Sequence, residues 1–206
     1  MIITISREFG SGGRELGKRL ADILNFDYYD HEIISAVAEN RDMDSDFVED
    51  SLGQHGWRDY PLTLRSTLGS PFYVQSLSVN LLLEQKRVIE KIASLGKNCI
   101  IVGRDADVLL AEHHPFNLFV CASPDAKIKR CQERAPEGEN LTEKELLRKM
   151  KQIDKTRSQT RMILSGSEWG QRGTYDLVVN TTTWDIKELA PAVADFAMRW
   201  FNRKQQ

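Results

Sequence analysis

The start of this chain constrains its fold more than any other stretch, and it reads MIITISREFGSGGRELG. An apolar run over residues 2–5 leads into a glycine-rich loop, and a helical pattern follows. A strand, a glycine-rich turn and a helix in this order are typical of phosphate-binding loops, because glycines let backbone N–H groups turn toward an anion. This context favours a phosphate loop over a tight turn without a ligand. The predicted phosphate cradle is the backbone of Gly10, Ser11, Gly12 and Gly13.

The loop lacks the lysine of the usual pattern G-x-x-x-x-G-K-[ST], because Gly13 stands in the lysine position. The helix that begins near Arg14 still offers its positive N-terminal end to an anion. A cation for the phosphates would come from Arg7, Arg14 or Lys18, and Arg14 is the first candidate because it adjoins the lysine position. Since arginine offers a planar fork and lysine a compact charge, the exchange is not a neutral one.

Short apolar segments predict five strands, at Ile2–Ile5, Phe26–Tyr29, Cys99–Val102, Leu118–Cys121 and Leu177–Val179. Four of them are rich in Ile, Val, Leu or Phe with little alternation, which is typical of strands buried on both faces of a parallel sheet. Helical patterns separate the strands. We therefore predict an α/β fold in which helices flank a five-stranded, mostly parallel sheet.

Residues that favour the N-cap position predict where several helices begin. Ser123 precedes Pro124, which predicts a helix that begins there. Thr142 and Glu145 have the spacing of a capping box. Asp185 is placed to cap the last helix.

The composition indicates a globular protein with a single domain over residues 1–206. A net charge of −2 argues against a nucleic-acid or membrane partner. The three cysteines are odd in number, which predicts reduced thiols rather than a disulfide framework. We recognise no signal peptide and no membrane-spanning run, so we expect a cytoplasmic protein, and no oligomeric state is predicted.

Residues 40–75 differ in composition from the rest of the chain. Glycines and prolines alternate there with Trp57, Tyr60, Phe72 and Tyr73. We interpret this stretch as an insertion packed on or near a binding cleft. The aromatic side chains could stack on a base, although local packing is their more common use and the interpretation we prefer.

Several segments, taken in order, can be compared with one enzyme family. They are ITISREFGSGGRELGKRLAD, FDYYDHEII, CIIVGRDADVLL, NLFVCASPDAKIKRCQER, IDKTRSQTR and YDLVVNTTTWDIKELA. Together they resemble the strands, phosphate loop and lid of bacterial cytidylate kinases. The loop SREFGSGGRELG and the ending WG…YDLVVNT resemble the cytidylate kinase-like branch more closely still. The resemblance covers residues 1–39 and 80–200.

The resemblance implies a P-loop nucleoside-monophosphate kinase fold with a mobile helical lid, which we expect over residues 123–167. It places the insertion 40–75 on the acceptor side. The implied reaction is transfer of the γ-phosphoryl group of ATP, with Mg²⁺, to a pyrimidine monophosphate such as CMP or dCMP. Small nucleotides are therefore the expected partners. Such chemistry depends mostly on positioning and on charge neutralisation.

Site residues in the core follow from the same resemblance. Asp30 falls on the family's aspartate at the end of strand two, and Arg104 and Asp105 fall on its Gly-Arg-Asp segment. Arg104 is expected to hold the acceptor. Asp30 or Asp105 could hold Mg²⁺ with its water shell, since this ion prefers one or two carboxylates plus phosphates. Simpler roles are open for all three, because Arg104 could form a structural ion pair and the aspartates could cap the helices that follow.

The lid segment carries over Asp154, Lys155, Arg157 and Arg161. Lys155 is expected at the donor nucleotide, and the two arginines would close over the transferring phosphoryl group and exclude water. Arg157 and Arg161 share one helix face at i, i+4, where like charges cost a few tenths of a kcal/mol unless an anion lies between them. This spacing modestly favours a phosphate site over a solvated helix face.

Four positions depart from the family pattern. Gly13 replaces the loop lysine, and Val102 replaces an aspartate before Gly-Arg-Asp. Ala36 stands where an arginine helps to hold the acceptor phosphate, and Cys121 where an aspartate helps to read cytosine. The first departure bears on catalysis and the last two on acceptor identity. Cations that could compensate are present at Arg41, Arg58 and Arg65.

These departures leave two other functions open. One is a nucleotide-binding module that kept the fold and lost turnover, for which Gly13 and Val102 argue. The other is a P-loop kinase whose acceptor is not a nucleotide, for which Ala36 and Cys121 argue.

Overall fold

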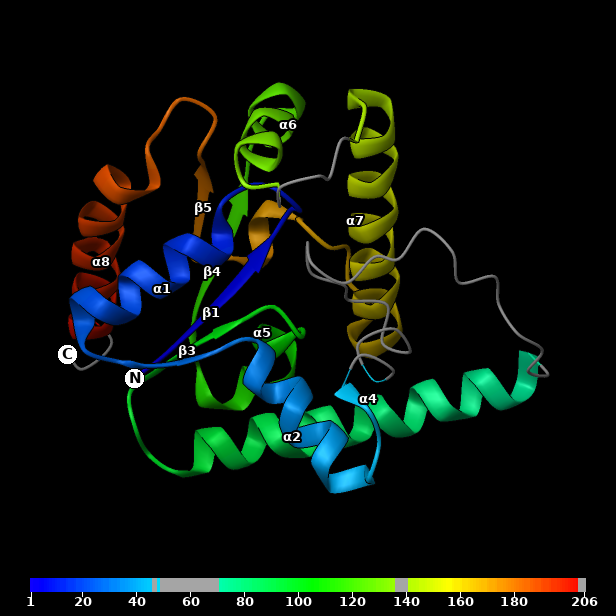
Figure 1. The fold of residues 1–206 in the computed structure, drawn as a ribbon. Coiled ribbons are helices and arrows are strands. Elements are labelled where there is room, and N and C mark those ends of the chain that lie inside the picture. The colour runs from blue at the N-terminus through cyan, green and yellow to red at the C-terminus, as the bar shows by residue number, and fades with distance from the viewer. Residues whose placement is uncertain (46–47, 49–70, 136–140, 204–206) are drawn as a thin grey trace.

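The computed structural model describes residues 1–45, 48, 71–135 and 141–203. Its five-stranded sheet has the order β2-β3-β1-β4-β5, and every pairing is parallel. The strands are β1 Ile2–Arg7, β2 Asp27–Tyr29, β3 Cys99–Val102, β4 Phe116–Cys121 and β5 Leu177–Asn180. The predicted strands and the α/β class are therefore confirmed (Figure 1).

Helices connect the strands and cover both faces of the sheet. They are α1 Gly13–Leu24, α2 His31–Arg41, α4 Pro71–Ser94, α5 Ala106–Leu109, α6 Pro124–Glu133, α7 Glu143–Ser165 and α8 Ile186–Arg203, with 3-10 turns η1 Ala111–His113 and η2 Arg172–Thr174. The predicted caps are present, since Ser123 and Asp185 accept backbone N–H groups and Thr142 forms a capping box with Glu145. In the described part of the chain, no helix combines the length and apolarity needed to cross a bilayer.

The sheet separates two apolar cores, because successive side chains of a strand point to opposite faces. Ile3 and Ile5 of β1 belong to one core, with the buried sides of α1 and α8. Cys99 and Ile101 of β3 belong to the other core, which α2 and α4 cover. Figure 1 shows α1 and α8 together on one side of the molecule and α2 and α4 together on the other. Both faces of the central strands are thus buried, as their continuous apolar sequences predict.

The two helices of the predicted lid share a third apolar cluster with the glycine-rich loop. Phe9 of the loop packs with Ile128 and Cys131 of α6 and with Met150 and Ile153 of α7. Because Phe9 belongs to this cluster, α6 and α7 lie directly against the loop.

Most of the predicted insertion 40–75 lies outside the described residues. These include the predicted cations Arg58 and Arg65 and the aromatic residues Trp57 and Tyr60. α2 ends at Arg41 and α4 begins at Pro71, so both ends of the stretch are helical. Arg41 forms an ion pair with Glu84 of α4 at 3.3 Å, which joins α2 to α4.

Candidate phosphate-binding site

Charged side chains gather where the first three strands of the sheet end. Arg7 is the last residue of β1, Asp30 follows β2, and residues 103–105 follow β3. The strand order places the end of β3 between the ends of β2 and β1. Open α/β sheets bind ligands at the carboxyl ends of their strands. The predicted core residues therefore meet where such a fold would hold a ligand.

The glycine-rich loop has the backbone geometry that its glycines predict. Gly10 and Gly12 have positive φ angles of 75° and 84°, a region that favours glycine. Arg130 donates to the carbonyl oxygen of Gly10 at 2.8 Å, and Thr181 donates to that of Ser11 at 2.7 Å. These bonds satisfy loop carbonyl groups within the protein. The first turn of α1, which begins at Gly13, supplies backbone N–H groups for an anion.

Among the described residues, three arginines act on the buried carboxylate of Asp30. Arg14 Nε lies 2.5 Å from one carboxylate oxygen and Arg7 Nη2 lies 3.6 Å from the other. Burial opposes ionisation of Asp30, but Arg7, Arg14 and Arg104 hold its pKa below the usual value. Arg157 of α7 completes this group, and its pKa is lowered by burial and by the charges of Arg7 and Arg104. Arginines that repel one another in this way would be stabilised by an anion.

We call Arg7, Arg14, Arg104 and Arg157 the arginine cluster. It combines one residue from each of two strand ends with one from the start of α1 and one from the lid. Its members come from three separate parts of the sequence, so their convergence is a property of the fold.

Arg104 lies within an unusual turn. Gly103, Arg104 and Asp105 have consecutive positive φ angles of 74°, 62° and 51°. A left-handed backbone costs a non-glycine residue roughly 1–2 kcal/mol, and such strain is concentrated at functional sites. The turn buries Arg104, which is 2% exposed, and Gln85 Nε2 donates to its carbonyl oxygen at 3.2 Å. The strained turn thus fixes Arg104 in the cluster.

Neither predicted aspartate caps the helix that follows it. Asp30 and Asp105 occupy the N-cap positions of α2 and α5, but neither side chain makes a capping hydrogen bond. Asp30 faces the arginines instead. Asp105 is buried, and burial together with the neighbouring Asp107 raises its pKa to about 7. A carboxyl group that titrates near neutral pH in a ligand crevice is typical of a functional site.

The lid arginines do not converge on one point. Arg157 Nη1 donates to the carbonyl oxygen of Arg7 at 2.9 Å and to Asp154 at 3.1 Å, within the cluster. Arg161 Nη1 instead donates to the buried Asp107 at 2.5 Å. The anion expected between Arg157 and Arg161 does not fit this geometry, because each arginine has a carboxylate of its own. The structure does not bring Arg161 into the cluster.

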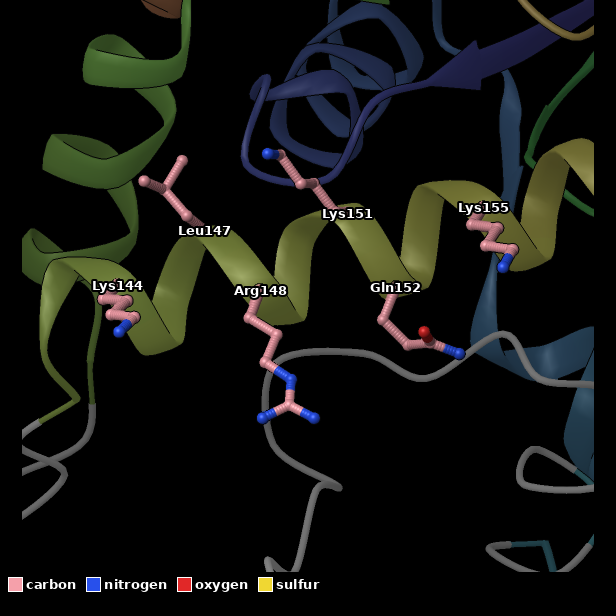
Figure 2. A pocket seen from close by; sticks show the side chains of 6 residues that line it. All are labelled: Lys144, Leu147, Arg148, Lys151, Gln152 and Lys155. Atoms are coloured by element: carbon pink, nitrogen blue, oxygen red, sulfur yellow. The ribbon is translucent and has the colours of Figure 1, made fainter.

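The predicted donor-side lysines also lie outside the cluster. Lys18 is exposed on α1 and Lys155 is exposed on α7. Lys155 lines a surface hollow of about 440 Å³ together with Lys144, Leu147, Arg148, Lys151 and Gln152. Figure 2 shows these side chains on successive turns of α7, with Leu147 and Lys151 directed opposite to Arg148 and Gln152. A charged helix face of this kind is usually solvated.

The contacts of several acidic residues in and around the site are not predictable from the sequence, although Asp154 itself is among the predicted residues. Asp154 Oδ1 accepts the backbone N–H of Phe9 at 2.8 Å, which ties α7 to the loop. Glu8 forms an ion pair with Lys127 of α6 at 3.0 Å. Asp107 was not predicted as the partner of Arg161, because nothing in the local sequence marks a pair separated by 54 positions. Only the assembled fold reveals these contacts.

Two of the four departures from the family pattern occupy apolar surroundings. Val102 is fully buried and Ala36 packs against the core beneath α2. The Cys121 thiol lies 3.6 Å from the carbonyl oxygen of Val179 and donates to it. The fourth, Gly13, lies against Arg7, as described below. No charge at positions 36, 102 or 121 contributes to this site.

The fold defines a structural class, the P-loop fold found in several kinases. Shikimate kinase from Bacteroides thetaiotaomicron has a similar structure, with 14% identity, a TM-score of 0.56 and coverage of 95% of this chain and 97% of that chain. The protein TT1252 from Thermus thermophilus gives 17% identity and a TM-score of 0.55, with 97% of each chain covered. At such identities the likeness concerns the fold alone.

The particular family follows from the sequence itself. This chain belongs to the cytidylate kinase-like family, which it matches over residues 2–183. An uncharacterized protein from Eubacterium ventriosum has a similar structure, with 27% identity, a TM-score of 0.69 and coverage of 96% of this chain and 98% of that chain. A comparison with curated proteins finds no significant match. The predicted family resemblance is confirmed.

Proposed function

We propose that this protein transfers the γ-phosphoryl group of ATP to a small acceptor, with CMP or dCMP as the first candidates. The observation that carries the proposal is the arginine cluster beside the glycine-rich loop. Phosphoryl transfer depends on positioning the phosphates and neutralising their charge. Four guanidinium groups at the carboxyl ends of parallel strands supply both. Membership of a kinase-like family supports the same chemistry.

On the donor side, the backbone of Gly10, Ser11, Gly12 and Gly13 would cradle the β-phosphate at the N-terminus of α1. Arg157 would lie over the transferring group, since it reaches the loop from α7 and donates to the carbonyl oxygen of Arg7. The apolar cluster around Phe9 keeps α6 and α7 against the loop. Water would thereby be excluded from the phosphates, which strengthens every charge interaction in the site.

On the acceptor side, Arg104 would bind the phosphate or carboxylate of the acceptor. It is buried at the end of β3, and its conformation is set by the left-handed turn. Asp30 would act as a positioning residue, because it orients Arg14 and Arg7 around that point. Arg14 would add a second, more exposed charge.

Mg²⁺ would supply charge neutralisation between the phosphate oxygens of ATP. Asp30 does not fit the role of its ligand, because Arg14 and Arg7 face its two oxygens at 2.5 Å and 3.6 Å. Asp105 fits better. It lies beside Asp107, and the mutual repulsion that helps to raise its pKa would be relieved by a nearby cation.

A second candidate function is a kinase whose acceptor is not a nucleotide. Ala36 packs in the core, and the Cys121 thiol donates to a backbone carbonyl group. Neither position can supply the arginine or aspartate with which related cytidylate kinases are expected to hold CMP. A third candidate, nucleotide binding without turnover, is favoured by the absence of a lysine at Gly13.

A coupled ADP-release assay with Mg·ATP tests the proposal. The acceptor panel would contain nucleoside monophosphates and small phosphorylated or hydroxylated metabolites. We expect turnover with CMP or dCMP, and we expect Arg104→Ala to raise the KM for the acceptor. Turnover only with another metabolite would support the second candidate. ATP binding with no turnover on the whole panel would contradict the kinase proposal and support the third.

A further inference from the structure

The glycine-rich loop has the spacing of the usual phosphate loop, but glycine and the cationic residue have exchanged positions. When Gly12 and Gly13 are set at the last two positions of G-x-x-x-x-G-K, the first glycine falls on Arg7. The usual loop begins with glycine and ends with a cation. This loop begins with a cation and ends with glycine.

The side chain of Arg7 occupies the space that a side chain at position 13 would need. A Cβ atom built on Gly13 would lie 2.6 Å from Cβ of Arg7, 3.0 Å from its Cγ and 3.3 Å from Cβ of Val120. Non-bonded carbon atoms do not approach to 2.6 Å, because their optimal separation is roughly 3.5–4.0 Å. Gly13 is not among the glycines with positive φ. Contact with Arg7, rather than backbone conformation, therefore requires glycine at position 13.

The guanidinium group of Arg7 also lies against a second glycine. Because β3 lies between β1 and β2, Arg7 reaches Asp30 across the end of β3. The residue at that end is Gly103, and a Cβ atom there would overlap Nη1 of Arg7. Among the described residues the ion-pair partner of Arg7 is Asp30, at 3.6 Å, which is longer than a hydrogen bond. The fork of Arg7 can thus donate to an anion while Asp30 keeps it in place.

Arg14, the first candidate from the sequence, is placed differently. Its Nε lies 2.5 Å from Oδ2 of Asp30, and its side chain is 51% exposed, against 11% for Arg7. Arg14 therefore holds Asp30 from the solvent side. Arg7 lies against the first residue of α1, where the lysine of the usual loop would begin.

We propose that Arg7 supplies to the phosphates of a bound nucleotide the charge that a lysine at position 13 supplies in the usual loop. Arg7, Gly13 and Gly103 then form one unit, in which the two glycines leave room for the arginine. The inference rests on the proposed function for the identity of the anion. It assigns the charge to the guanidinium group of Arg7 at the end of β1. This planar group binds phosphate through directed hydrogen bonds.

The steric fit of Arg7 against Gly13 is tested without nucleotide, by thermal unfolding of two variants and of wild type. We expect Gly13→Lys to lower the Tm in the presence of Arg7. The double variant Arg7→Gly with Gly13→Lys, which restores the usual pattern, should recover part of that loss, since two residues in contact do not act additively. A Gly13→Lys protein as stable as wild type would overturn the inference, and so would a double variant no more stable than Gly13→Lys.

The role of the Arg7 charge in phosphate binding is tested by calorimetric titration with ATP and, separately, with inorganic tripolyphosphate. Arg7→Met keeps the volume of the side chain beside both glycines, so this variant retains the packing of the fold. Loss of a charged hydrogen-bond donor predicts affinity weaker by about tenfold or more. Arg14→Met should lose less affinity for ATP than Arg7→Met. The double variant Arg7→Gly with Gly13→Lys should bind ATP more tightly than the single variant Arg7→Gly. Arg19→Met, which removes an exposed charge paired with Glu15, is the matched control and should change affinity by less than about twofold.

Two results would overturn the assignment of Arg7. One is an Arg7→Met protein that binds ATP and tripolyphosphate as tightly as wild type, and the other is a larger loss for Arg14→Met. Wild-type protein that binds neither ligand would overturn this inference and the proposed function together. Wild-type protein that binds ATP but phosphorylates no acceptor contradicts only the proposed function, and the affinities of the variants still decide on Arg7.

Discussion

Arg157 and Arg161 lie one turn apart on the same helix, yet the fold gives them different surroundings. Arg157 joins three other arginines at the glycine-rich loop, where burial and their charges lower its pKa. Arg161 is buried against Asp107 and lies over the ring of Tyr175, with its guanidinium carbon 5.4 Å from the ring centre. Burial opposes its charge, but Asp107 raises the pKa of Arg161 above the usual value. Both arginines have a carboxylate partner, but Arg157 is also repelled by the other three members of the arginine cluster, and an anion would relieve this repulsion.

The difference teaches that a cation's role depends on which acids the fold brings to it. Spacing at i, i+4 predicts that two side chains share a helix face, but not what that face meets. Arg161 meets a carboxylate from the segment after β3, whereas Arg157 meets the end of β1. An arginine that other arginines repel at the strand ends is a candidate for binding an anion, even though it has a carboxylate partner. An arginine whose charge is supported by a buried acid, without repulsion from other arginines, is a candidate for stability.

The largest effect is expected from breaking the buried pair. Arg161→Ala leaves Asp107 buried without its cation, which should lower the free energy of unfolding by about 3–5 kcal/mol. Chemical denaturation measures this loss. Adding Asp107→Asn should restore much of it, because the remaining group is then uncharged. A loss below about 1 kcal/mol, as is typical of an exposed pair, would show that Arg161 is not held as described.

Asp105 sharpens the comparison, since Arg161, Arg7 and Arg157 all act on its carboxyl group. Its pKa is raised to about 7 in the folded protein from an ordinary value of 3.8. The folded state therefore binds a proton more tightly than the unfolded chain, so this group makes stability fall as pH rises from about 4 to 7. Asp105→Asn should remove this fall in stability. At pH 8 its free energy of unfolding should therefore be a few kcal/mol larger than that of wild type. Asparagine also tolerates the left-handed backbone at this position.

Unfolding curves of wild type and Asp105→Asn at pH 5 and pH 8 measure the difference. Parallel dependence of the two proteins on pH would contradict the raised pKa. Asp185→Asn, which changes an aspartate at the start of α8, controls for the loss of a carboxylate elsewhere.

Arg157, which we propose to face the phosphates, should show a larger effect on kinetics and a smaller effect on stability than Arg161. Arg157→Ala removes its bonds to Arg7 and Asp154, but it also removes a charge that the other arginines repel. The free energy of unfolding should therefore fall by less than for Arg161→Ala. Steady-state kinetics should show kcat/KM for ATP lower by roughly 10- to 100-fold. A large loss of stability with unchanged kinetics would make Arg157 a structural residue like Arg161.

The smallest effect is expected two residues earlier on the helix. Lys155 is exposed and belongs to the face of α7 shown in Figure 2. Lys155→Met should lower ATP affinity by only about twofold, through the loss of a screened long-range charge. Titration of Lys155→Met and Arg157→Met with ATP at several salt concentrations checks this. Affinity that depends on a direct phosphate contact should change more strongly with salt. A loss equal to that of Arg157→Met would place Lys155 at the donor, as the family resemblance implies.

The strands and most helix starts of this fold were predictable because they depend on local patterns. Continuous apolar runs mark buried parallel strands, and the capping box at Thr142 marks the start of α7. The location of the site was predictable as well, since the glycine-rich loop and the Gly-Arg-Asp segment both follow strands. Each of these features depends on a few consecutive residues.

The division of roles among the arginines was not predictable in the same way. Arg14 was favoured over Arg7 because it adjoins Gly13 in sequence, whereas Arg7 fills the space beside Gly13 in the fold. The partner of Arg161 is separated from it by 54 positions. Which acid meets which base depends on strand order and helix packing, and no short segment encodes either. The stretch 49–70 remains outside the part of the chain that the structure describes.

The proposed function requires that the arginine cluster binds the phosphates of a nucleotide. Calorimetric titration of ATP into wild-type protein and into Arg157→Ala tests it most directly. We predict saturable binding to wild type and affinity weaker by about tenfold or more in the variant. Wild-type protein that binds no ATP, or a variant that binds it as tightly as wild type, would contradict the claim.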